Sequence, residues 1–210
     1  IEELRSGRFR AQHAAFRFDI GNDGWRAPLG DPDALVLSEV MQNRRYGKDL
    51  RDQLAATLTR QVRLSLAIEQ LPEMDNRVTL DRSLLDPLGN PRPAIHYKIS
   101  DYTLQGMAAA RHISKQLFEL AGIEDFSDKG RTKWFPSVQH GDTVFRYHGM
   151  GHFGGTHLMG ASAADSVLDP DQRCWEHQNL YMIGSGSFPT MGTSNPTLTI
   201  AALAIRTAEH

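Results

Sequence analysis

Three histidines lie close together in a glycine-rich stretch of the C-terminal third: His148, His152 and His157. A histidine side chain titrates near neutral pH, so it can take the proton of a substrate hydroxyl as a general base. The same side chain is a common metal ligand. Here the glycines prevent a helix from presenting the three rings on one face, and no cluster of carboxylates completes a ligand set. We therefore disfavour a zinc or iron site, and with it a metal-dependent hydrolase, and expect no metal.

A second stretch that could do chemistry lies near the C-terminus. Residues 179–183 are an apolar run of strand length, and Gly184 and Gly186 follow it. Asn195 and Pro196 then signal the start of a helix, because asparagine can cap a helix and proline fits its first turn. The residues after Pro196 are apolar almost all round, so we expect a buried helix. A buried helix start leaves N–H groups and a positive dipole end that need an electron-rich partner.

These blocks resemble the C-terminal signature of the glucose–methanol–choline (GMC) oxidoreductases, which are FAD-dependent enzymes. The family pattern reads here as HFGGT (152–156), NLYMIGSGSFP (179–189) and NPTLTIAALAIR (195–206). Two earlier stretches, FDIGNDGW (18–25) and EQLP (69–72), resemble the bacterial branch that oxidises sugars and polyols. The resemblance covers most of the chain, and it implies hydride transfer from an alcohol to flavin.

The resemblance also implies roles for single residues. His152 stands at the position of the family's catalytic histidine. Asn195 stands where the family has a second histidine or an asparagine that binds the substrate hydroxyl. The implied site thus has His152 and Asn195 as catalytic residues, Gln70, His152 and Asn195 as substrate-binding residues, and Gly184, Ser185, Gly186, Pro196 and Thr197 as FAD-binding residues.

The helix that starts at Pro196 has an implied role toward the flavin. Reduction places negative charge on the N1–C2=O edge of the ring, and a helix N-terminus stabilises such a charge. The N–H of Thr197 is the natural donor, because proline has none. Gly184 and Gly186 would allow the strand end to approach the ribityl–phosphate part closely. Many relatives have an acidic residue at the position of Gly184, so its contact is absent here.

Some of these assignments compete with structural ones. As an N-cap, Asn195 would bond its own helix and would not reach a substrate; we favour the role in the active site. Glu69 and Gln70 lie at the end of the clearest predicted strand, and the alternative to a substrate contact is an exposed pair at the strand end. His157 occupies a variable position of the family signature, which indicates a structural role.

Composition restricts the classes of function. The 210 residues suffice for one large domain or two small ones, and 40% hydrophobic with 23% charged residues is typical of a globular protein. A net charge of −2 without a basic cluster excludes a nucleic-acid-binding surface. Cys174 is the only cysteine, which excludes an intrachain disulfide. No apolar run is long enough to span a bilayer.

Periodicity predicts the elements. Apolar alternation predicts strands at 16–20, 62–69 and 95–99, and 77–80 as the return strand of 62–69. Helical spacing predicts helices at 49–60 and from Ser100 or Asp101 to Gly122. Three prolines and a glycine (Pro87, Gly89, Pro91 and Pro93) predict an extended loop at 87–93, and residues 123–141 are turn-rich. Strands followed by helices indicate an α+β fold with an antiparallel sheet.

The expected organisation follows from the resemblance. Residues 1–143 would belong to a substrate-binding domain with an antiparallel sheet and flanking helices. Residues 144–210 would supply the C-terminal strand and helix of a Rossmann-like FAD-binding domain.

The usual phosphate-binding unit is not found in the sequence. GxGxxG occurs only at 149–154, and no capped helix follows it. We therefore expect a segment of a longer flavoenzyme, inactive on its own, whose partners are an alcohol or sugar substrate and a separate N-terminal FAD-binding portion. A cytoplasmic location is favoured. The alternative function is a flavin-free ligand-binding module derived from the substrate domain.

Overall fold

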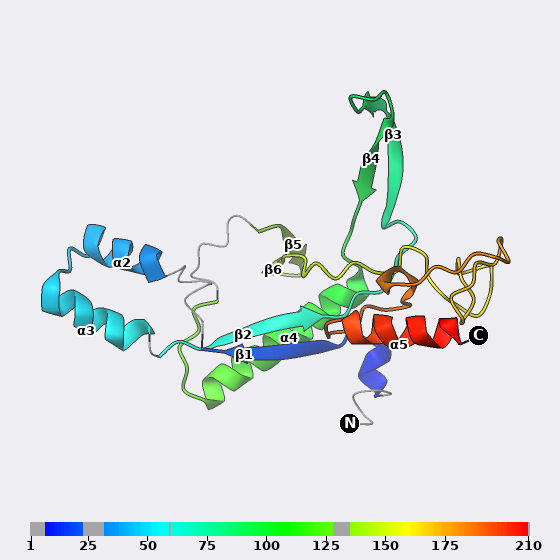
Figure 1. Cartoon of the computed structure of the whole chain (residues 1–210). Helices are drawn as coiled ribbons and strands as arrows, with labels where there is room; N and C mark the ends of the chain where they lie inside the picture. The colour runs from blue at the N-terminus through cyan, green and yellow to red at the C-terminus, as the bar shows by residue number, and fades with distance from the viewer. Residues whose placement is uncertain (1–6, 23–31, 59, 128–134, 210) are drawn as a thin grey trace. The chain divides into compact units, whose positions relative to one another are not determined.

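The computed structural model describes residues 7–22, 32–58, 60–127 and 135–209 (Figure 1). Residues 23–25, which end the FDIGNDGW stretch, lie outside them. Helices and two-stranded sheets alternate along the chain, so the fold class is α+β, as predicted. The elements are η1 (Arg8–Ala11), β1 (Phe16–Gly21), α2 (Pro32–Met41), α3 (Gly47–Leu58), β2 (Arg63–Ile68), β3 (Arg77–Leu85), β4 (Pro91–His96), α4 (Asp101–Leu120), β5 (Ser137–His140), β6 (Thr143–Arg146), η4 (Ser185–Ser187) and α5 (Thr197–Ala208).

The helices predicted from apolar spacing are present. Helix α3 covers most of the predicted segment 49–60, and α4 begins at Asp101 as expected. Of the predicted stripe, Met107 and Ala110 are buried, whereas Ile113, Leu117 and Leu120 are exposed. Both predictions are confirmed because the spacing of apolar residues along one helix is a local property of the sequence.

The pairing of the strands differs from the prediction. Strand β2 pairs with β1, and β3 pairs antiparallel with β4, with Val78 opposite Ile95. The segment 77–80 is therefore not the return strand of 62–69. Only a short turn separates β3 from β4, and closing a short loop costs less conformational entropy than bringing distant strands together.

The predicted loop at 87–93 is also partly wrong. Pro91 and Pro93 lie inside β4, opposite Leu85 and Leu80. Proline lacks the N–H that a central strand would need, but β4 is bonded on one side only within a two-stranded sheet. The actual turn is held by the Asp86 carboxylate, which accepts hydrogen bonds from the amides of Leu88 and Asn90.

A helix and a hairpin were not predicted. The helix is α2. The other is the antiparallel hairpin of β5 and β6, in which His140 is paired with Thr143 across the two residues Gly141 and Asp142. A two-residue turn that contains glycine is a typical hairpin connection, so the hairpin had a local signal within the stretch read only as turn-rich.

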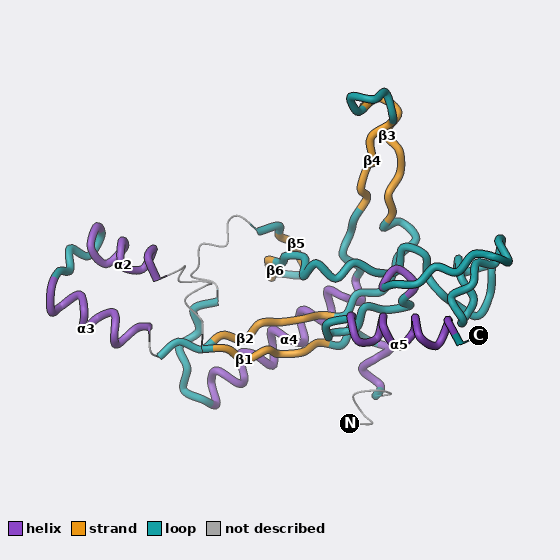
Figure 2. The backbone as a smooth tube through the Cα atoms, in the orientation of Figure 1, coloured by secondary structure: helices purple, strands orange, loops and turns teal. Residues whose placement is uncertain are grey.

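The strand expected at 179–183 does not form. Tyr181 makes a single isolated bridge to Arg173, and Ile183 is 56% exposed. A strand needs neighbours that take up its backbone groups, and the described residues provide none beyond this bridge. Loops accordingly make up most of the chain between β6 and α5 (Figure 2). No Rossmann-like sheet lies among the described elements.

Helix α5 forms as predicted, but it is not buried. Leu198 is 83% exposed and Ile205 is 61% exposed, and Thr207 is its only buried side chain. The Thr207 hydroxyl donates to Oε1 of Gln172 (2.7 Å), and Nε2 of Gln172 donates to the Ser187 hydroxyl (2.6 Å). The C-terminal end of α5 is thus held by buried polar contacts, while part of its apolar surface, including Leu198 and Ile205, is exposed.

The chain divides into two compact units. The first comprises Ile1–Ala15, Ile68–Gly106 and Gly149–His210, and its buried apolar residues are Ala14, Ile99, Leu104, Leu168, Cys174 and Phe188. The second comprises Phe16–Ala67 and Met107–His148, and its buried apolar residues are Ala67, Met107 and Ala110. The assignment of 1–143 and 144–210 to a substrate domain and an FAD domain remains a prediction.

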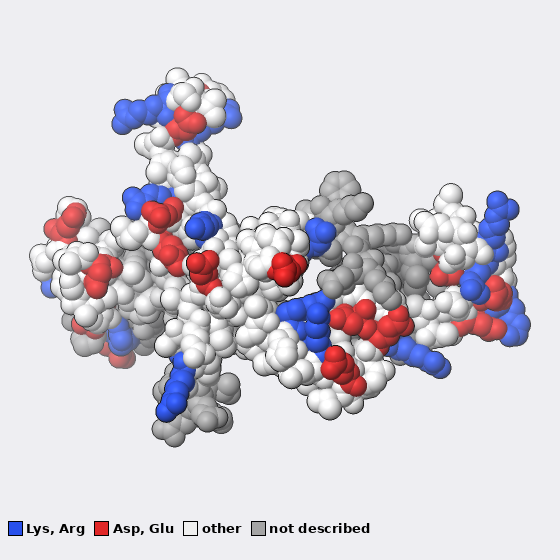
Figure 3. All heavy atoms as spheres, turned by 180° about the vertical axis from the view of Figure 1, so that it is seen from behind, with Lys and Arg blue, Asp and Glu red and all other residues white. Residues whose placement is uncertain are grey.

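The surface charge and the length of the helices bear on possible contacts with nucleic acid and with membranes. Acidic and basic side chains are interspersed on the face drawn in Figure 3. Among the described residues, no helix combines the length and the apolar character that crossing a bilayer requires.

Candidate active site

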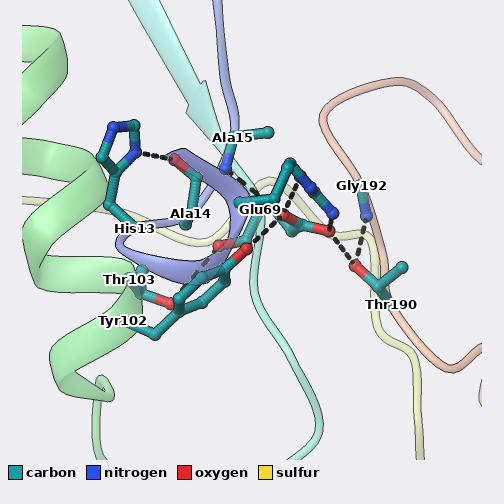
Figure 4. A network of polar contacts seen from close by, with 9 residues as sticks. His13, Ala14, Ala15, Glu69, Tyr102, Thr103, Thr190 and Gly192 are labelled. Carbon is teal, nitrogen blue, oxygen red and sulfur yellow. Dashed lines mark hydrogen bonds and ion pairs between the residues drawn. The ribbon is translucent and has the colours of Figure 1, made fainter. Parts of the chain in front are cut away.

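The Glu69 carboxylate, just after β2, is the centre of a polar network in the first unit (Figure 4). The residue is 2% exposed. Arg10 forms two bonds with it, Nη1 to Oε2 (2.6 Å) and Nη2 to Oε1 (3.0 Å). The amide of Ala15 and the hydroxyl of Tyr102 donate to Oε2, each at 3.2 Å, and the hydroxyl of Thr190 donates to Oε1 at 2.8 Å. The alternative of an exposed strand-end pair is therefore wrong for Glu69.

These donors keep the carboxylate ionised. Burial alone raises the pKa of Glu69. The hydrogen bonds from Arg10, Thr190 and Ala15 together lower the pKa by more than burial raises it, so the net pKa lies below its ordinary value. The same ion pair raises the pKa of Arg10. Burial and the nearby negative charge raise the pKa of Tyr102. A carboxylate that holds its charge this firmly is a poor proton acceptor, so Glu69 is an anchor and not a general base.

The anchor is bonded to the loop between η4 and α5. The Thr190 hydroxyl, which donates to Glu69, accepts a hydrogen bond from the amide of Gly192 (3.1 Å). The amide of Met191 donates to the carbonyl of Gln70 (3.4 Å). Two neighbouring residues, Glu69 and Gln70, thereby bond two successive residues of the loop, Thr190 and Met191.

The loop that carries His152 runs beside η4. The Ser185 hydroxyl donates to the carbonyl of Phe153 (2.6 Å), and the amide of Gly155 donates to the carbonyl of Ser185 (3.3 Å). Further along, the amide of His157 donates to the carbonyl of Gly186 (3.0 Å). The two family blocks, more than twenty residues apart in the sequence, therefore lie side by side.

Two glycines let the His152 loop pack closely. A Cβ atom on Gly154 would clash with Sδ of Met191, and one on Gly155 would lie 2.7 Å from Cγ of Pro72. Gly155 also has φ +75°, which a residue with a Cβ adopts at a cost. The loop is thus in direct contact with both the segment after Glu69 and the loop of Thr190.

His157 fits the structural role expected for it. Its ring fills the space where a Cβ on Gly186 would lie. Burial lowers the pKa of the His157 imidazole, although the carbonyl of Ile183 opposes that shift. Among the described residues, no group of three or more histidine, cysteine, aspartate or glutamate side chains is arranged to hold a metal ion.

The residues with predicted chemical roles are less enclosed. His152 is half-buried and Asn195 is exposed, and within the described part of the chain no hydrogen bond joins them. Nε2 of Gln70 donates to the hydroxyl of Tyr97 (2.9 Å). The structure thus brings the backbone segments of His152 and Gln70 together, whereas their roles and that of Asn195 remain predictions.

The start of α5 differs from the expected cap. Pro196, not Asn195, occupies the N-cap position, and no side chain caps the helix. The capping role for Asn195 is therefore wrong. Proline at this position supplies neither a side-chain acceptor nor an N–H, so the first amides of α5, from Thr197 onward, receive no hydrogen bond from the N-cap residue's side chain. Gly184 has φ +114° and ψ 178°, a conformation almost restricted to glycine, with open space where a Cβ would lie.

Sequence reasoning missed the Glu69 network. The strand at 62–69 was predicted from the alternation of Val62, Leu64, Leu66 and Ile68 with their neighbours, a pattern that favours burial of the apolar set. Ala67 and Glu69 are the buried positions instead, and Leu66 is 38% exposed. The partners of Glu69 come from three distant segments, and an arginine, a tyrosine and a threonine in isolation carry no signal of such a site.

Comparison with known proteins gives the following matches. Residues 72–204, more than half of the chain, match the family model of the GMC oxidoreductases. The fructose dehydrogenase large subunit of Gluconobacter japonicus is 29% identical over 209 residues, which is 100% of this chain and 34% of that protein. Paromamine 6'-oxidase of Streptomyces fradiae is 30% identical over 149 residues, which is 71% of this chain and 25% of that protein. The 2-methyl-1,2-propanediol dehydrogenase of Mycolicibacterium austroafricanum is 30% identical over 145 residues, which is 68% of this chain and 23% of that protein. The chain therefore spans about a third or less of the length of these relatives.

Proposed function

Because the chain belongs to the GMC oxidoreductase family, in its bacterial sugar-oxidising branch, we propose that it is the C-terminal segment of an FAD-dependent enzyme. This enzyme oxidises an alcohol group of a sugar or polyol to a carbonyl. The observation that carries the proposal is the bonding of the His152 loop along η4, which assembles the two signature blocks into one site.

The residues present fit a flavin. The uncapped start of α5 offers N–H groups and a positive dipole end, which suit a cofactor that gains negative charge on reduction. The open space at Gly184 suits a close approach of the cofactor to the backbone. Gly184, Ser185, Gly186, Pro196 and Thr197 would hold it. When bound, FAD supplies the acceptor for the hydride that leaves the alcohol carbon.

The protein side chains handle the proton and the position of the alcohol. His152 takes the hydroxyl proton at a ring nitrogen as the C–H electron pair leaves with the hydride, and a carbonyl remains. Proton transfer of this kind contributes ~10²–10⁴-fold to the rate. Asn195 binds the hydroxyl, and Gln70, already fixed through Tyr97, offers its amide oxygen to a second hydroxyl of the sugar.

The remainder of the longer protein completes the site. The only GxGxxG spacing, at 149–154, is followed by a loop and not by a helix, so it does not form a dinucleotide site. The N-terminal FAD-binding portion would hold the ADP part and cover the apolar surface of α5. This chain by itself is expected to be inactive and to bind FAD no tighter than micromolar in calorimetry. A flavin-free binding module leaves the uncapped α5 start without a partner, so we rank it second.

The test uses the full-length protein that contains this chain. We expect a flavin absorption spectrum that bleaches anaerobically with at least one member of a panel of sugars and polyols. His152→Ala should keep the flavin and bleach at least ~10²-fold more slowly. His96→Ala, at an exposed position of β4, is the matched control and should bleach normally. A full-length protein without flavin, or a His152→Ala variant with unchanged bleaching, would contradict the proposal.

A further inference from the structure

The Thr190 hydroxyl connects a buried charge to the loop that precedes Asn195. It donates to Oε1 of Glu69 at 2.8 Å and accepts from the amide of Gly192 at 3.1 Å (Figure 4). A single hydroxyl thus fixes both the start and the turn of the loop. Asn195 follows only three residues after Gly192, so the position of that turn determines where Asn195 lies.

The Glu69 carboxylate, which accepts the hydrogen bond from Thr190, is itself held in place and cannot move with the loop. Glu69 is held by Arg10 and by the amide of Ala15, and the hydroxyl of Tyr102 bonds the same carboxylate. Its backbone is fixed as well, because the hydroxyl of Thr103 donates to the carbonyl of Glu69 at 3.3 Å. The carboxylate therefore acts as a fixed point against which the loop is placed.

The same loop also contacts the segment that carries His152. Sδ of Met191 fills the space in front of Gly154, two residues after His152. The amide of Met191 is bonded in turn to the carbonyl of Gln70. Thr190 and Met191 thus connect both the Asn195 side and the His152 side of the site to the segment of Glu69 and Gln70.

We propose that Glu69 and Thr190 are positioning residues, which set the placement of Asn195 relative to His152 through the Glu69–Thr190–Gly192 contacts. That Thr190 holds the loop follows from the described contacts alone, whereas the effect of the loop's placement on turnover rests on the proposed function. Neither residue touches the reacting atoms. Bonds to an ionised carboxylate are stronger than bonds between neutral groups, which suits a contact that must hold a loop.

Thr190→Val in the full-length flavoprotein tests the proposal, because valine keeps the shape and removes the hydroxyl. We expect faster amide hydrogen exchange in residues 188–196. We also expect at least a tenfold lower rate constant of flavin reduction, an apparent Kd for substrate changed by less than threefold, and unchanged flavin content. Thr190→Ser should restore both exchange and rate, since it returns the hydroxyl.

Thr79→Val is the matched control. Thr79 bonds His96 through its hydroxyl on the exposed β3–β4 hairpin, so its loss should leave exchange in 188–196 and flavin reduction unchanged. Glu69→Gln is a second probe of the same contact and should shift both readouts in the direction of Thr190→Val.

The readouts separate two kinds of failure. Normal exchange in 188–196 in the Thr190→Val protein would overturn the positioning role, and so would faster exchange with normal flavin reduction. A wild-type protein whose flavin no sugar or polyol reduces would refute the proposed function, while the exchange measurement would still decide whether Thr190 holds the loop.

Discussion

The two halves of the candidate site differ in how completely this chain builds them. The frame, made of Glu69, Thr190 and the contacts of Gly154 and Gly155, is buried or closely packed and richly bonded. The reactive side, with Asn195 and the uncapped start of α5, is exposed. The frame therefore depends on contacts within the chain, whereas the reactive side is shaped to meet a cofactor and a substrate. Substitutions should divide in the same way between stability and chemistry.

The largest loss of stability is expected from Arg10→Met. It leaves the buried Glu69 carboxylate without its countercharge, and breaking a buried ion pair costs about 3–5 kcal/mol. Arg10 is itself 32% exposed, so we expect about 3 kcal/mol in urea unfolding of the full-length protein. Lys48→Met breaks the exposed pair with Asp52 and should cost under ~1 kcal/mol. Equal losses in the two variants would remove the distinction between the frame and an ordinary surface pair.

Gly155→Ala should cost less, about 1–2 kcal/mol, because alanine at φ +75° is strained. The added Cβ must also displace the ring of Pro72, which tests whether the His152 loop is held as closely as described. Gly149→Ala is the control, since a Cβ there meets nothing within 4 Å. The measurement is again the change in the free energy of unfolding, and an unaffected Gly155→Ala protein would show a looser loop.

The pH dependence of stability should report the Glu69 anchor. Its folded pKa lies below the ordinary 4.5, so its contribution is complete above about pH 4.5 and is lost as the pH falls through the folded pKa. Since one proton is involved, the slope from this group is at most about 1.4 kcal/mol per pH unit. Unfolding of the wild type and of Glu69→Gln between pH 7 and pH 3 should differ by this component. Parallel curves would mean that the carboxylate is not anchored.

The smallest effect on stability is expected from Asn195→Ala, within ~0.5 kcal/mol. Asn195 is exposed and does not cap α5, so unfolding should hardly change while flavin reduction slows. Asn195→Asp should slow reduction further, because its negative charge opposes the arrival of the hydride. A loss of 1 kcal/mol or more in Asn195→Ala, with normal reduction, would assign Asn195 to the frame.

The parts of the fold that could be predicted are those encoded within single segments. The stripe from Met107 to Leu120 predicts α4, and the spacing of apolar residues in 49–60 predicts α3, because each pattern lies within one helix. The partner of β2 could not be predicted, because its pairing with β1 joins segments about fifty residues apart and either strand has several acceptable neighbours. The strand at 179–183 was expected from an apolar run of strand length, but among the described residues its pairing is limited to one isolated bridge, between Tyr181 and Arg173.

The site shows the same division. The blocks around His152 and Gly184 could be located from the sequence, because the motif carries the glycines that close packing needs. The Glu69 network could not, because Arg10, Tyr102 and Thr190 meet only in the folded chain. The start of α5 was located from Asn195 and Pro196, and the N-cap falls on Pro196, which excludes only the alternative of Asn195 as the cap.

The Glu69–Thr190 bond also bears on the order in which the protein folds. Arg10 and Glu69 are 59 residues apart in the chain, and Glu69 and Thr190 are 121 apart. Doubling the length of a closed loop costs only about 0.6 kcal/mol, so the longer connection adds little to the equilibrium penalty. Non-local contacts nevertheless slow folding, and during synthesis the N-terminal partners are released from the ribosome first. Arg10 and Glu69 can thus pair before Thr190 exists, and the loop before α5 joins the carboxylate last.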